Sequence, residues 1–331
     1  MKLLRALAIA AIALVVIAAV IGALMLYAVF GERSHPATAT QVIVARGSSF
    51  AQVARALADV DVISNVTTFR LLARLRGEEA AVRAGEYRFP PHLSQSDVLR
   101  ALVTGGAQVA TWVTVPEGFT AAQIAQRLER DGVGAAPGFL REFMGRGIVV
   151  GGVRTKTLEG YLFPSTYLMP LGASPQQAAA PMVAQFFKEL PSDASARARA
   201  LRVTLPQAVT IASLIEREAK SEVDRPKIAE VIYNRLRLGM PLQVDATIEY
   251  ALPEHKAQLS FADLKIDSPY NTYTHVGLPP TPIANPGLPS LEAALRPSKG
   301  DDLYYVYCGN DVHVFARTLA EHQANVARCL H

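Results

Sequence analysis

The longest uncharged stretch of the sequence limits what its N-terminal part can fold into. It runs for 25 residues, from Ala6 to Phe30, and follows Lys2 and Arg5. A helix of this length can cross the roughly 30 Å apolar core of a bilayer, whereas the apolar region of a cleaved signal peptide has only about 7 to 15 residues. We therefore expect residues 1–30 to be an uncleaved transmembrane anchor, although Ala37–Ala39 has the small-x-small form of a cleavage site. The positive residues at the start should keep the N-terminus in the cytoplasm and place the rest of the chain outside it.

The remaining composition is that of a folded protein with little excess charge. Half of the 331 residues are hydrophobic and 19% are charged, so the chain can bury a large core and is expected to form two domains. Without Lys2 and Arg5, 31 of the 33 basic residues remain against 29 acidic residues. So small a difference predicts no basic patch, and no nucleic-acid partner is expected.

A motif repeats after residues 31–40, a polar stretch with a proline that is expected to be a tether. The pattern V-x-x-G-x-S-x-x-Q at residues 44–52 returns at residues 115–123 with Thr in place of Ser, and a weaker copy lies at residues 89–102. Ser or Thr followed three residues later by Gln is a capping box, so a strand, a turn and a helix are expected in each copy. Such units resemble LysM-type modules, which bind the N-acetyl sugars of cell-wall glycans, and this implies a LysM-like α/β region at residues 41–150. A generic α+β packing unit is the alternative.

Residues 151–331 are expected to form a second, mostly helical domain that ends in a β-hairpin. Proline, glycine and short polar residues bound four expected helices, at residues 175–190, 193–202, 205–220 and 224–238. Residues 157–170 are rich in aromatic residues, glycine and proline and are expected to be irregular. Alternation around a Gly-Asn-Asp turn predicts a hairpin at residues 303–316, with a last helix after it. The fold class expected for the whole chain is therefore α+β.

The two cysteines, Cys308 and Cys329, both lie near the C-terminus. In an oxidising compartment they could form a disulfide that closes a loop of about 20 residues. Two unpaired thiols without a role are the alternative, because a sequence does not give the distance between them. Neither interpretation involves catalysis.

One glutamate of the helix expected at residues 205–220 falls on its apolar face. Ile211, Leu214 and Ile215 form one stripe at 3.6-residue spacing, and Glu218 lies within that stripe. Glu216 points to the other side, where an i,i+4 ion pair with Lys220 is expected on the surface. Glu218 should therefore be partly buried, whereas Glu216 should be exposed.

A carboxyl group on an apolar face is either paired with a cation or has its pKa raised by burial. A raised pKa suits the general acid of glycosidic bond cleavage, and pairing of Glu218 with an arginine of another helix is the alternative. Other chemistries lack their motifs, since the sequence contains no G-x-x-x-x-G-K-[ST], G-x-S-x-G, G-x-G-x-x-G or S-x-x-K. Its seven histidines show no metal-binding spacing, so neither a metal nor another cofactor is expected.

Three long blocks resemble the YceG family of endolytic murein transglycosylases. They are ASLIEREA (212–219), VIYNRLRLGMPLQVDATIEYAL (231–252) and SPYNTYTHVGLPPTPIANPG (268–287), and LEGYLFPSTY (158–167) fits the same family. The resemblance implies a lysozyme-like catalytic domain at residues 151–331, in which Glu218 is the one catalytic residue. Ala219 and Ala246 depart from the family pattern, which commonly has a hydroxyl residue and a proline there.

The resemblance also implies a substrate groove. Its residues would be Gln243, Asp245, Asn271, Thr272 and Tyr273, with Glu159 and Tyr161 nearby. Turn formation is the alternative role for Asn271 and Thr272, and simple packing is the alternative for Tyr273.

The activity that the resemblance implies is non-hydrolytic cleavage of peptidoglycan between N-acetylmuramic acid and N-acetylglucosamine, leaving 1,6-anhydro ends. Glu218 would act first as acid and then as base, close to the plasma (cell inner) membrane and beside cell-wall synthesis enzymes. One alternative is a muramidase that uses water, with Asp245 or Glu159 as its second carboxylate. The other is a non-catalytic scaffold that binds the cell wall.

Overall fold

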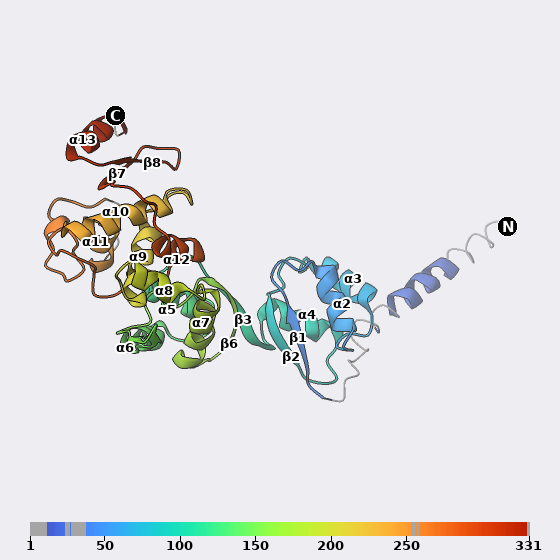
Figure 1. Ribbon diagram of the computed structural model, residues 1–331. Helices are drawn as coiled ribbons and strands as arrows, with labels where there is room; N and C mark the ends of the chain where they lie inside the picture. Colours follow the sequence, from blue (N-terminus) through green and yellow to red (C-terminus); the bar gives the residue numbers. More distant parts are fainter. Residues whose placement is uncertain are drawn as a thin grey trace. The chain divides into compact units, whose positions relative to one another are not determined.

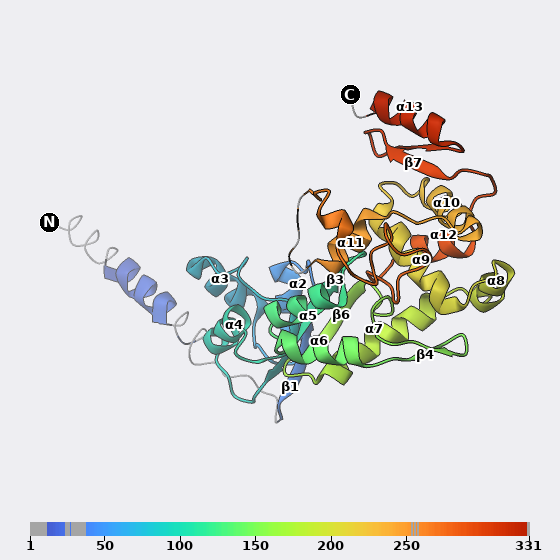
Figure 2. The same ribbon diagram turned by 90° about the vertical axis from the view of Figure 1, so that its left-hand side faces the viewer.

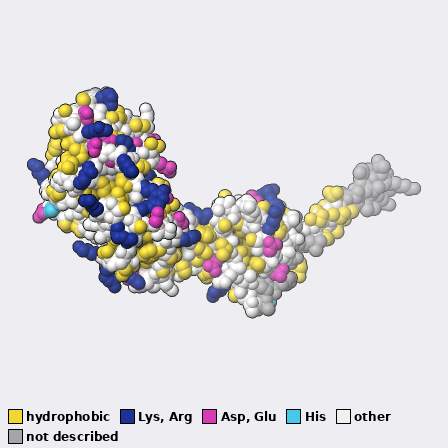
Figure 3. All heavy atoms as spheres, viewed as in Figure 1, with side chains coloured by type: hydrophobic (Ala, Val, Ile, Leu, Met, Phe, Trp, Pro, Cys, Tyr) yellow, Lys and Arg dark blue, Asp and Glu magenta, His cyan; other side chains and the backbone are white. Residues whose placement is uncertain are grey.

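The computed structural model describes residues 12–23, 27, 38–252, 254, 256 and 258–329. Residues 12–23 form a helix whose side chains are exposed, and Figure 3 shows its hydrophobic surface. Within the described residues, no helix is both long enough and apolar enough to cross a membrane. Most of the expected anchor and tether, including Ala37 of the cleavage-like motif, lies outside these residues. The anchor therefore stays a prediction.

The chain divides into two compact units and mixes helices with sheet, which confirms the expected α+β character. Residues up to Trp112 together with Leu168–Leu171 make the N-terminal unit, and Val113–Tyr167 together with Gly172–His331 make the C-terminal unit. The sequence-based boundary at residues 150 and 151 falls inside the C-terminal unit, in the turn between two short strands, β4 (Val149–Val150) and β5 (Val153–Arg154).

The N-terminal unit packs three helices beside strands (Figure 1). Along the chain its elements are β1 (Thr40–Val44), α2 (Phe50–Ala58), α3 (Val66–Arg76), β2 (Gly85–Phe89), α4 (Gln95–Thr104) and the start of β3 (Gln108–Val115). Strands β1 and β2 are antiparallel, with Thr40 opposite Phe89, and the sheet has the order β1-β2-β3-β6. Its core includes Phe69, Tyr87 and Leu99, none of which is measurably exposed.

The repeated motif forms strand, turn and helix in both strong copies, as expected. Ser49 and Gln52 cap α2 reciprocally, and Thr120 and Gln123 do the same for α5 (Ala121–Arg130). The glycine of each copy, Gly47 or Gly118, has a φ of about +76° or +75°, which glycine adopts at little cost. The shared backbone explains why the motif is spaced alike in the two copies. The LysM-like sugar-binding role stays a prediction.

The C-terminal unit surrounds one central helix, α9 (Leu205–Glu218) (Figure 1). Its other elements are α5, α6 (Ala136–Gly145), β4, β5, the first half of β6 (Ser165–Pro170), α7 (Pro175–Glu189), α8 (Ala194–Ala200), α10 (Arg225–Leu238), α11 (Asp245–Ala251), the 3-10 turn η2 (Asp263–Lys265), α12 (Leu288–Leu295), β7 (Tyr304–Tyr307), β8 (His313–Ala316) and α13 (Leu319–Cys329). Helices α8, α10, α11 and α12 all pack on α9. Every side chain of α9 from Val209 to Ile215 is buried, so α9 is the core of this unit.

The expected helices of this unit are confirmed within a few residues, with α9 ending two residues before its expected end. The expectation for residues 157–170 is wrong in its second half, because Ser165–Pro170 is strand β6 next to β3. The stretch Ser165–Pro170 alternates buried Tyr167 and Met169 with more exposed neighbours, and this period of two is typical of a strand.

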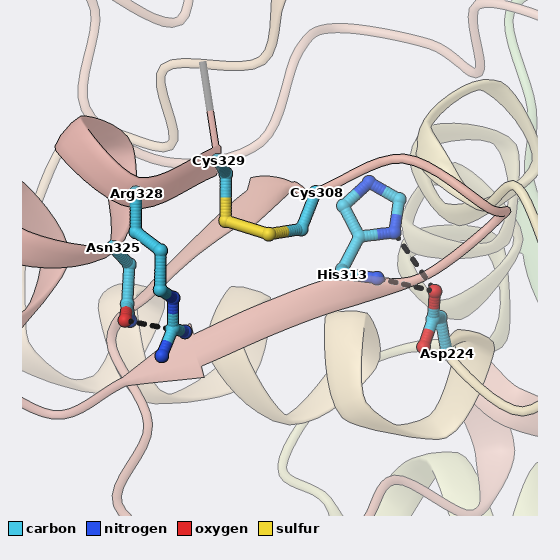
Figure 4. Close-up of a disulfide and its surroundings, with 6 residues drawn as sticks. All are labelled: Asp224, Cys308, His313, Asn325, Arg328 and Cys329. Atoms are coloured by element: carbon cyan, nitrogen blue, oxygen red, sulfur yellow. Dashed lines mark hydrogen bonds and ion pairs between the residues drawn. A yellow bond between two sulfur atoms is a disulfide. The ribbon is translucent and has the colours of Figure 1, made fainter. Parts of the chain in front are cut away.

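The C-terminal hairpin and last helix are tied together covalently. Strands β7 and β8 pair antiparallel, with Tyr305 opposite Phe315, and α13 lies beside β7 in Figures 1 and 2. Cys308 and Cys329 form a disulfide, which decides between the two interpretations of these cysteines (Figure 4).

The same close-up shows how the hairpin is anchored. The backbone N–H of His313 on β8 donates to the Asp224 carboxylate at 3.1 Å, and the ring Nδ1 of His313 lies 2.9 Å from the same oxygen. Asp224 is the N-cap residue of α10, and both side chains are buried. Through this pair the hairpin is held to a helix that packs on α9.

Candidate active site

A pocket of about 300 Å³ lies at the C-terminal end of α9. Four of the sequence-predicted residues line it, namely Glu218, Gln243, Asp245 and Tyr273, together with Arg235, Leu242, Tyr305 and His322. The pocket is therefore built from α9, α10, α11, the loop at residue 273, the hairpin and α13. Glu159, Tyr161, Asn271 and Thr272 do not line it.

Glu218 is the last residue of α9, and its carboxylate accepts a hydrogen bond of 2.9 Å from the Tyr305 hydroxyl. Burial is the main cause that raises the pKa of Glu218, and the nearby carboxylates of Asp245 and Glu249 raise it as well. The Tyr305 bond and Lys220 lower it, and the resulting pKa is about 7. The C-terminal end of a helix also disfavours a negative charge. Near neutral pH this carboxyl can therefore both hold and release a proton.

The alternative interpretation of Glu218 as an arginine partner does not hold in the structure. Among the described residues, no lysine or arginine forms an ion pair with it. Its neighbour Arg217 binds Glu249 instead, at 2.9 Å.

The buried guanidinium of Arg235 organises the pocket floor. Its Nη1 donates to the backbone oxygens of Pro241 and Leu242, at 3.1 and 2.9 Å, and to Oε1 of Gln243 at 3.3 Å. Its Nε donates to the oxygen of Leu303, just before β7, at 2.7 Å. One side chain thus fixes both the loop that presents Gln243, whose φ is +54°, and the strand that carries the Tyr305 hydroxyl.

Asn271 and Thr272 are buried behind the pocket and position its lining. The Asn271 amide donates to two backbone oxygens of the preceding loop and accepts from the N–H of Tyr273 at 2.9 Å. The Thr272 hydroxyl accepts from the N–H of Val244 at 3.0 Å. The Tyr273 hydroxyl in turn donates to Asp245. Asn271 therefore has the turn-forming role that was the alternative to substrate contact, whereas Thr272 holds its loop to the start of α11.

Glu159 and Tyr161 lie elsewhere in the C-terminal unit. Tyr161 is a core residue that packs edge-on against Phe186, with ring centroids 5.1 Å apart. Glu159 is 1% exposed and borders a different cavity, of about 830 Å³, that Arg217 and Glu249 also line. Burial raises the pKa of Glu159 and several hydrogen-bond donors lower it, and the resulting pKa is about 7.

Asn285 connects the segment of Glu159 to the segment of Phe119. Its Nδ2 donates to Glu159 Oε1 and to the oxygen of Phe119, both at 2.9 Å. Its Oδ1 accepts from the N–H groups of Gly160 and Leu162, at 2.9 and 2.8 Å. The other donors to Glu159 are the N–H of Ala121 and the Tyr250 hydroxyl. Glu159 is thus a structural carboxylate, whose hydrogen bonds hold Ala121, Tyr250 and Asn285 together.

Replacement of Glu159 by alanine is expected to lower the free energy of unfolding of the protein by about 3 kcal/mol, because it leaves the N–H of Ala121 and the amide of Asn285 buried with fewer partners. Urea unfolding followed by circular dichroism measures this loss. The control is Glu292→Ala, an exposed carboxylate of α12, which should change the free energy by less than about 0.5 kcal/mol. A Glu159→Ala protein as stable as the control would contradict the structural role.

The expectation for Glu216 is wrong. Its side chain is only 6% exposed, pairs with Arg225 at 3.3 Å and accepts from the N–H of Gly287 at 3.0 Å, instead of pairing with Lys220 on the surface. Helix α9 is covered by other helices on nearly all sides, so its polar face is buried as well.

Four lining residues were not predicted from the sequence, namely Arg235, Leu242, Tyr305 and His322. The one local signal was the aromatic run LYYVY at residues 303–307, because aromatic side chains usually bury a large area against other parts of a protein. Which site it covers depends on contacts such as Arg235 to Leu303, which a single sequence does not show.

Known bacterial proteins are similar to this chain along most of its length. The YceG-like family matches residues 42–328. A Bacillus subtilis protein named endolytic murein transglycosylase is 35% identical over 305 residues, which cover 86% of this chain and 83% of that protein. A Streptococcus pneumoniae (strain D39) protein of the same name is 30% identical over 321 residues, covering 86% of this chain but 57% of that protein.

A crystal structure points to the same family. The YceG-like protein of Listeria monocytogenes superposes with a TM-score of 0.62 at 31% sequence identity, and the match covers 87% of this chain and 99% of that one. The resemblance seen in the three sequence blocks is thereby confirmed. The chain belongs to the YceG-like family.

Proposed function

We propose that the chain is an endolytic murein transglycosylase, the activity that its relatives carry in their names. It would cleave peptidoglycan strands between N-acetylmuramic acid and N-acetylglucosamine and leave 1,6-anhydro ends. The observation that carries this proposal is the carboxyl group of Glu218, which is half-buried, lines the pocket and has a pKa of about 7.

The reaction needs two proton transfers, and Glu218 can perform both. Protonated Glu218 gives its proton to the departing glycosidic oxygen as the bond to the anomeric carbon breaks. The resulting carboxylate then takes the proton of the muramic acid 6-hydroxyl while that oxygen bonds to the same carbon. Glu218 ends protonated, as it began, and no water is consumed.

The residues around Glu218 support this cycle. The Tyr305 hydroxyl stabilises the carboxylate that forms between the two transfers, since it donates to Oε2. Asp245, held by Tyr273, opposes that charge and so favours return of the proton. Opposite influences of this kind keep the pKa of Glu218 near the working pH of a general acid and base.

A hydrolytic muramidase is a second candidate, because Asp245 lines the same pocket as Glu218 and could serve as the second carboxylate. Glu159 suits that role poorly, since its oxygens are bound within the protein and it borders another cavity. The product distinguishes the two reactions.

Mass spectrometry of fragments released from purified peptidoglycan tests the proposal. We expect anhydro-ended fragments, lighter by about one water molecule than fragments with reducing ends. Their release from within strands, rather than from strand ends, would support the endolytic mode. Reducing-end fragments would replace the proposal with the muramidase, and absence of any product would favour a non-catalytic scaffold.

The proposal extends to the parts of the chain outside the pocket. Residues 41–150 would hold glycan through LysM-like units, which is supported by the repeated capping boxes, and residues 151–331 would be the lysozyme-like catalytic domain. An anchor at residues 1–30 would hold the enzyme in the plasma membrane, N-terminus inside, beside cell-wall synthesis enzymes. The apolar helix at residues 12–23 supports that placement.

A further inference from the structure

His322 is a pocket residue without a role in the reaction derived above. His322 lies on α13, more than 100 residues after Glu218 in the sequence, and lines the same pocket. Its ring stacks on Tyr304 with centroids 5.3 Å apart, and Arg235 lies over the same Tyr304 ring, at 5.2 Å from its centroid. Burial and the nearby charge of Arg235 lower the pKa of His322, so its ring is neutral at neutral pH.

The hydrogen bonding of this ring is incomplete. The Nδ1 atom of His322 is buried and has no hydrogen-bond partner among the described residues. Nearly all buried polar atoms of folded proteins have a hydrogen-bond partner, so an exception calls for a reason. A neutral imidazole has one donor and one acceptor, which matches the hydroxyl and acetamido groups of a sugar.

The placement of His322 depends on the disulfide. Helix α13 buries none of its side chains, although it packs beside β7 and β8. Hydrophobic burial therefore contributes little to holding it, whereas the bond from Cys329, at its end, to Cys308, just after β7, closes a loop of 21 residues. Closing such a loop restricts the unfolded chain and so stabilises the folded arrangement. The hairpin is fixed to α10 through His313 and Asp224.

We propose that His322 is a substrate-binding residue, which hydrogen-bonds an N-acetyl sugar of the glycan strand in the Glu218 pocket, and that the Cys308–Cys329 disulfide holds it there. The glycan as ligand rests on the proposed function. The role is one of binding and not of proton transfer, so loss of His322 should act mainly through KM.

Binding can be measured without cleavage in the full-length Glu218→Gln protein, with purified glycan strands free of stem peptides as the probe. Adding His322→Ala should weaken binding about 10-fold or more in calorimetry. Adding His322→Asn, which keeps a donor and an acceptor near the position of Nδ1, should restore most of the affinity. The matched control is Gln323→Ala, an exposed neighbour on α13, which should leave affinity and Tm unchanged. Affinity within twofold of the parent in the His322→Ala protein, or no rescue by asparagine, would overturn the binding role.

The disulfide is tested by the Cys308→Ser, Cys329→Ser double variant in the same background. We expect weaker binding, and we expect little further loss when His322→Ala is added, because the ring is then already displaced. Fully additive losses, or full affinity without the disulfide, would overturn the part of the proposal that concerns the disulfide. Tm of each protein, together with its circular dichroism, shows whether it is folded.

Failure of this inference differs from failure of the proposed function. If the parent protein releases anhydro-ended fragments but the His322→Ala protein binds glycan as well as the parent does, the proposed reaction is supported and only the role of His322 is contradicted. If the parent protein releases no fragments but its pocket still binds glycan, and does so only when His322 is present, the binding role is supported and the proposed reaction is not.

Discussion

Replacing Glu218 with glutamine is expected to lower the rate of glycan cleavage by at least about 10⁴-fold. General acid and base steps each contribute about 10² to 10⁴ in rate, and Glu218 is proposed to perform both. Glutamine has nearly the same shape and can still accept the bond from the Tyr305 hydroxyl through its side-chain oxygen, so the pocket should persist. The initial rate of release of anhydro-ended fragments measures the effect.

The matched control is Glu222→Gln, which removes an exposed carboxylate four residues later and should leave the rate within twofold of the parent. Equal Tm values for the two variants would show that Glu218→Gln is folded. A Glu218→Gln protein that keeps more than about 1% of the parent rate would mean that another group, with Asp245 the first to examine, donates the proton.

The activity should fall steeply above neutral pH. The free enzyme must hold a proton on Glu218 to begin the reaction, and the pKa of this group is about 7. We therefore expect kcat/KM to be constant well below pH 7 and to approach a tenfold fall for each pH unit above it, about 50-fold between pH 7 and pH 9. Initial rates across this range, on the soluble fragments of one peptidoglycan preparation, measure the profile.

Two substitutions should shift the fall of kcat/KM at alkaline pH, the alkaline limb of the profile, in opposite directions. The Tyr305 hydroxyl stabilises the ionised form and lowers the pKa of Glu218, so Tyr305→Phe should move the limb to higher pH. The charge of Asp245 raises the pKa of Glu218, so Asp245→Asn should move the limb to lower pH. Movement of both limbs in the same direction, or a profile unchanged by either substitution, would mean that a different group sets the pH dependence.

Local sequence signals predicted where the helices begin. Thr204 and Gln207 form the capping box that starts α9, and the same chemistry starts α2 and α5 at the repeated motif. A capping box involves only residues three apart, so one sequence is enough to recognise it. The ends are less well marked, and α9 stops at Glu218 because Ala219 leaves the helical conformation, with φ −66° and ψ 130°.

The apolar stripe of α9 correctly predicted that Glu218 is partly buried, but it wrongly predicted that Glu216 is exposed. A helix with one buried face and one exposed face separates the two glutamates, but α9 is covered by several helices. The partners of Glu216 are Arg225, nine residues away, and the N–H of Gly287, 71 residues away. Periodicity describes a helix by itself, and contacts at such separations depend on the whole fold.

The pocket residues that the sequence did not predict also depend on contacts between distant parts of the chain. Tyr305 reaches Glu218 across 87 residues of sequence, and His322 arrives on a helix that the disulfide holds. The family resemblance supplied Gln243, Asp245 and Tyr273, which lie close to Glu218 in the fold, but it also supplied Glu159, which serves another cavity.

The hydrogen bonds of Asn285 set the order in which the C-terminal unit can mature during synthesis. Its amide bonds the oxygen of Phe119 across 166 residues and the N–H of Gly160 across 125. Translation adds about 5 to 20 residues per second, so Phe119 waits roughly 8 to 33 seconds for this partner to be made. During that interval α5 and the chain around Glu159 depend on local packing alone, and this early intermediate is where a chaperone or protease would encounter the newly made chain.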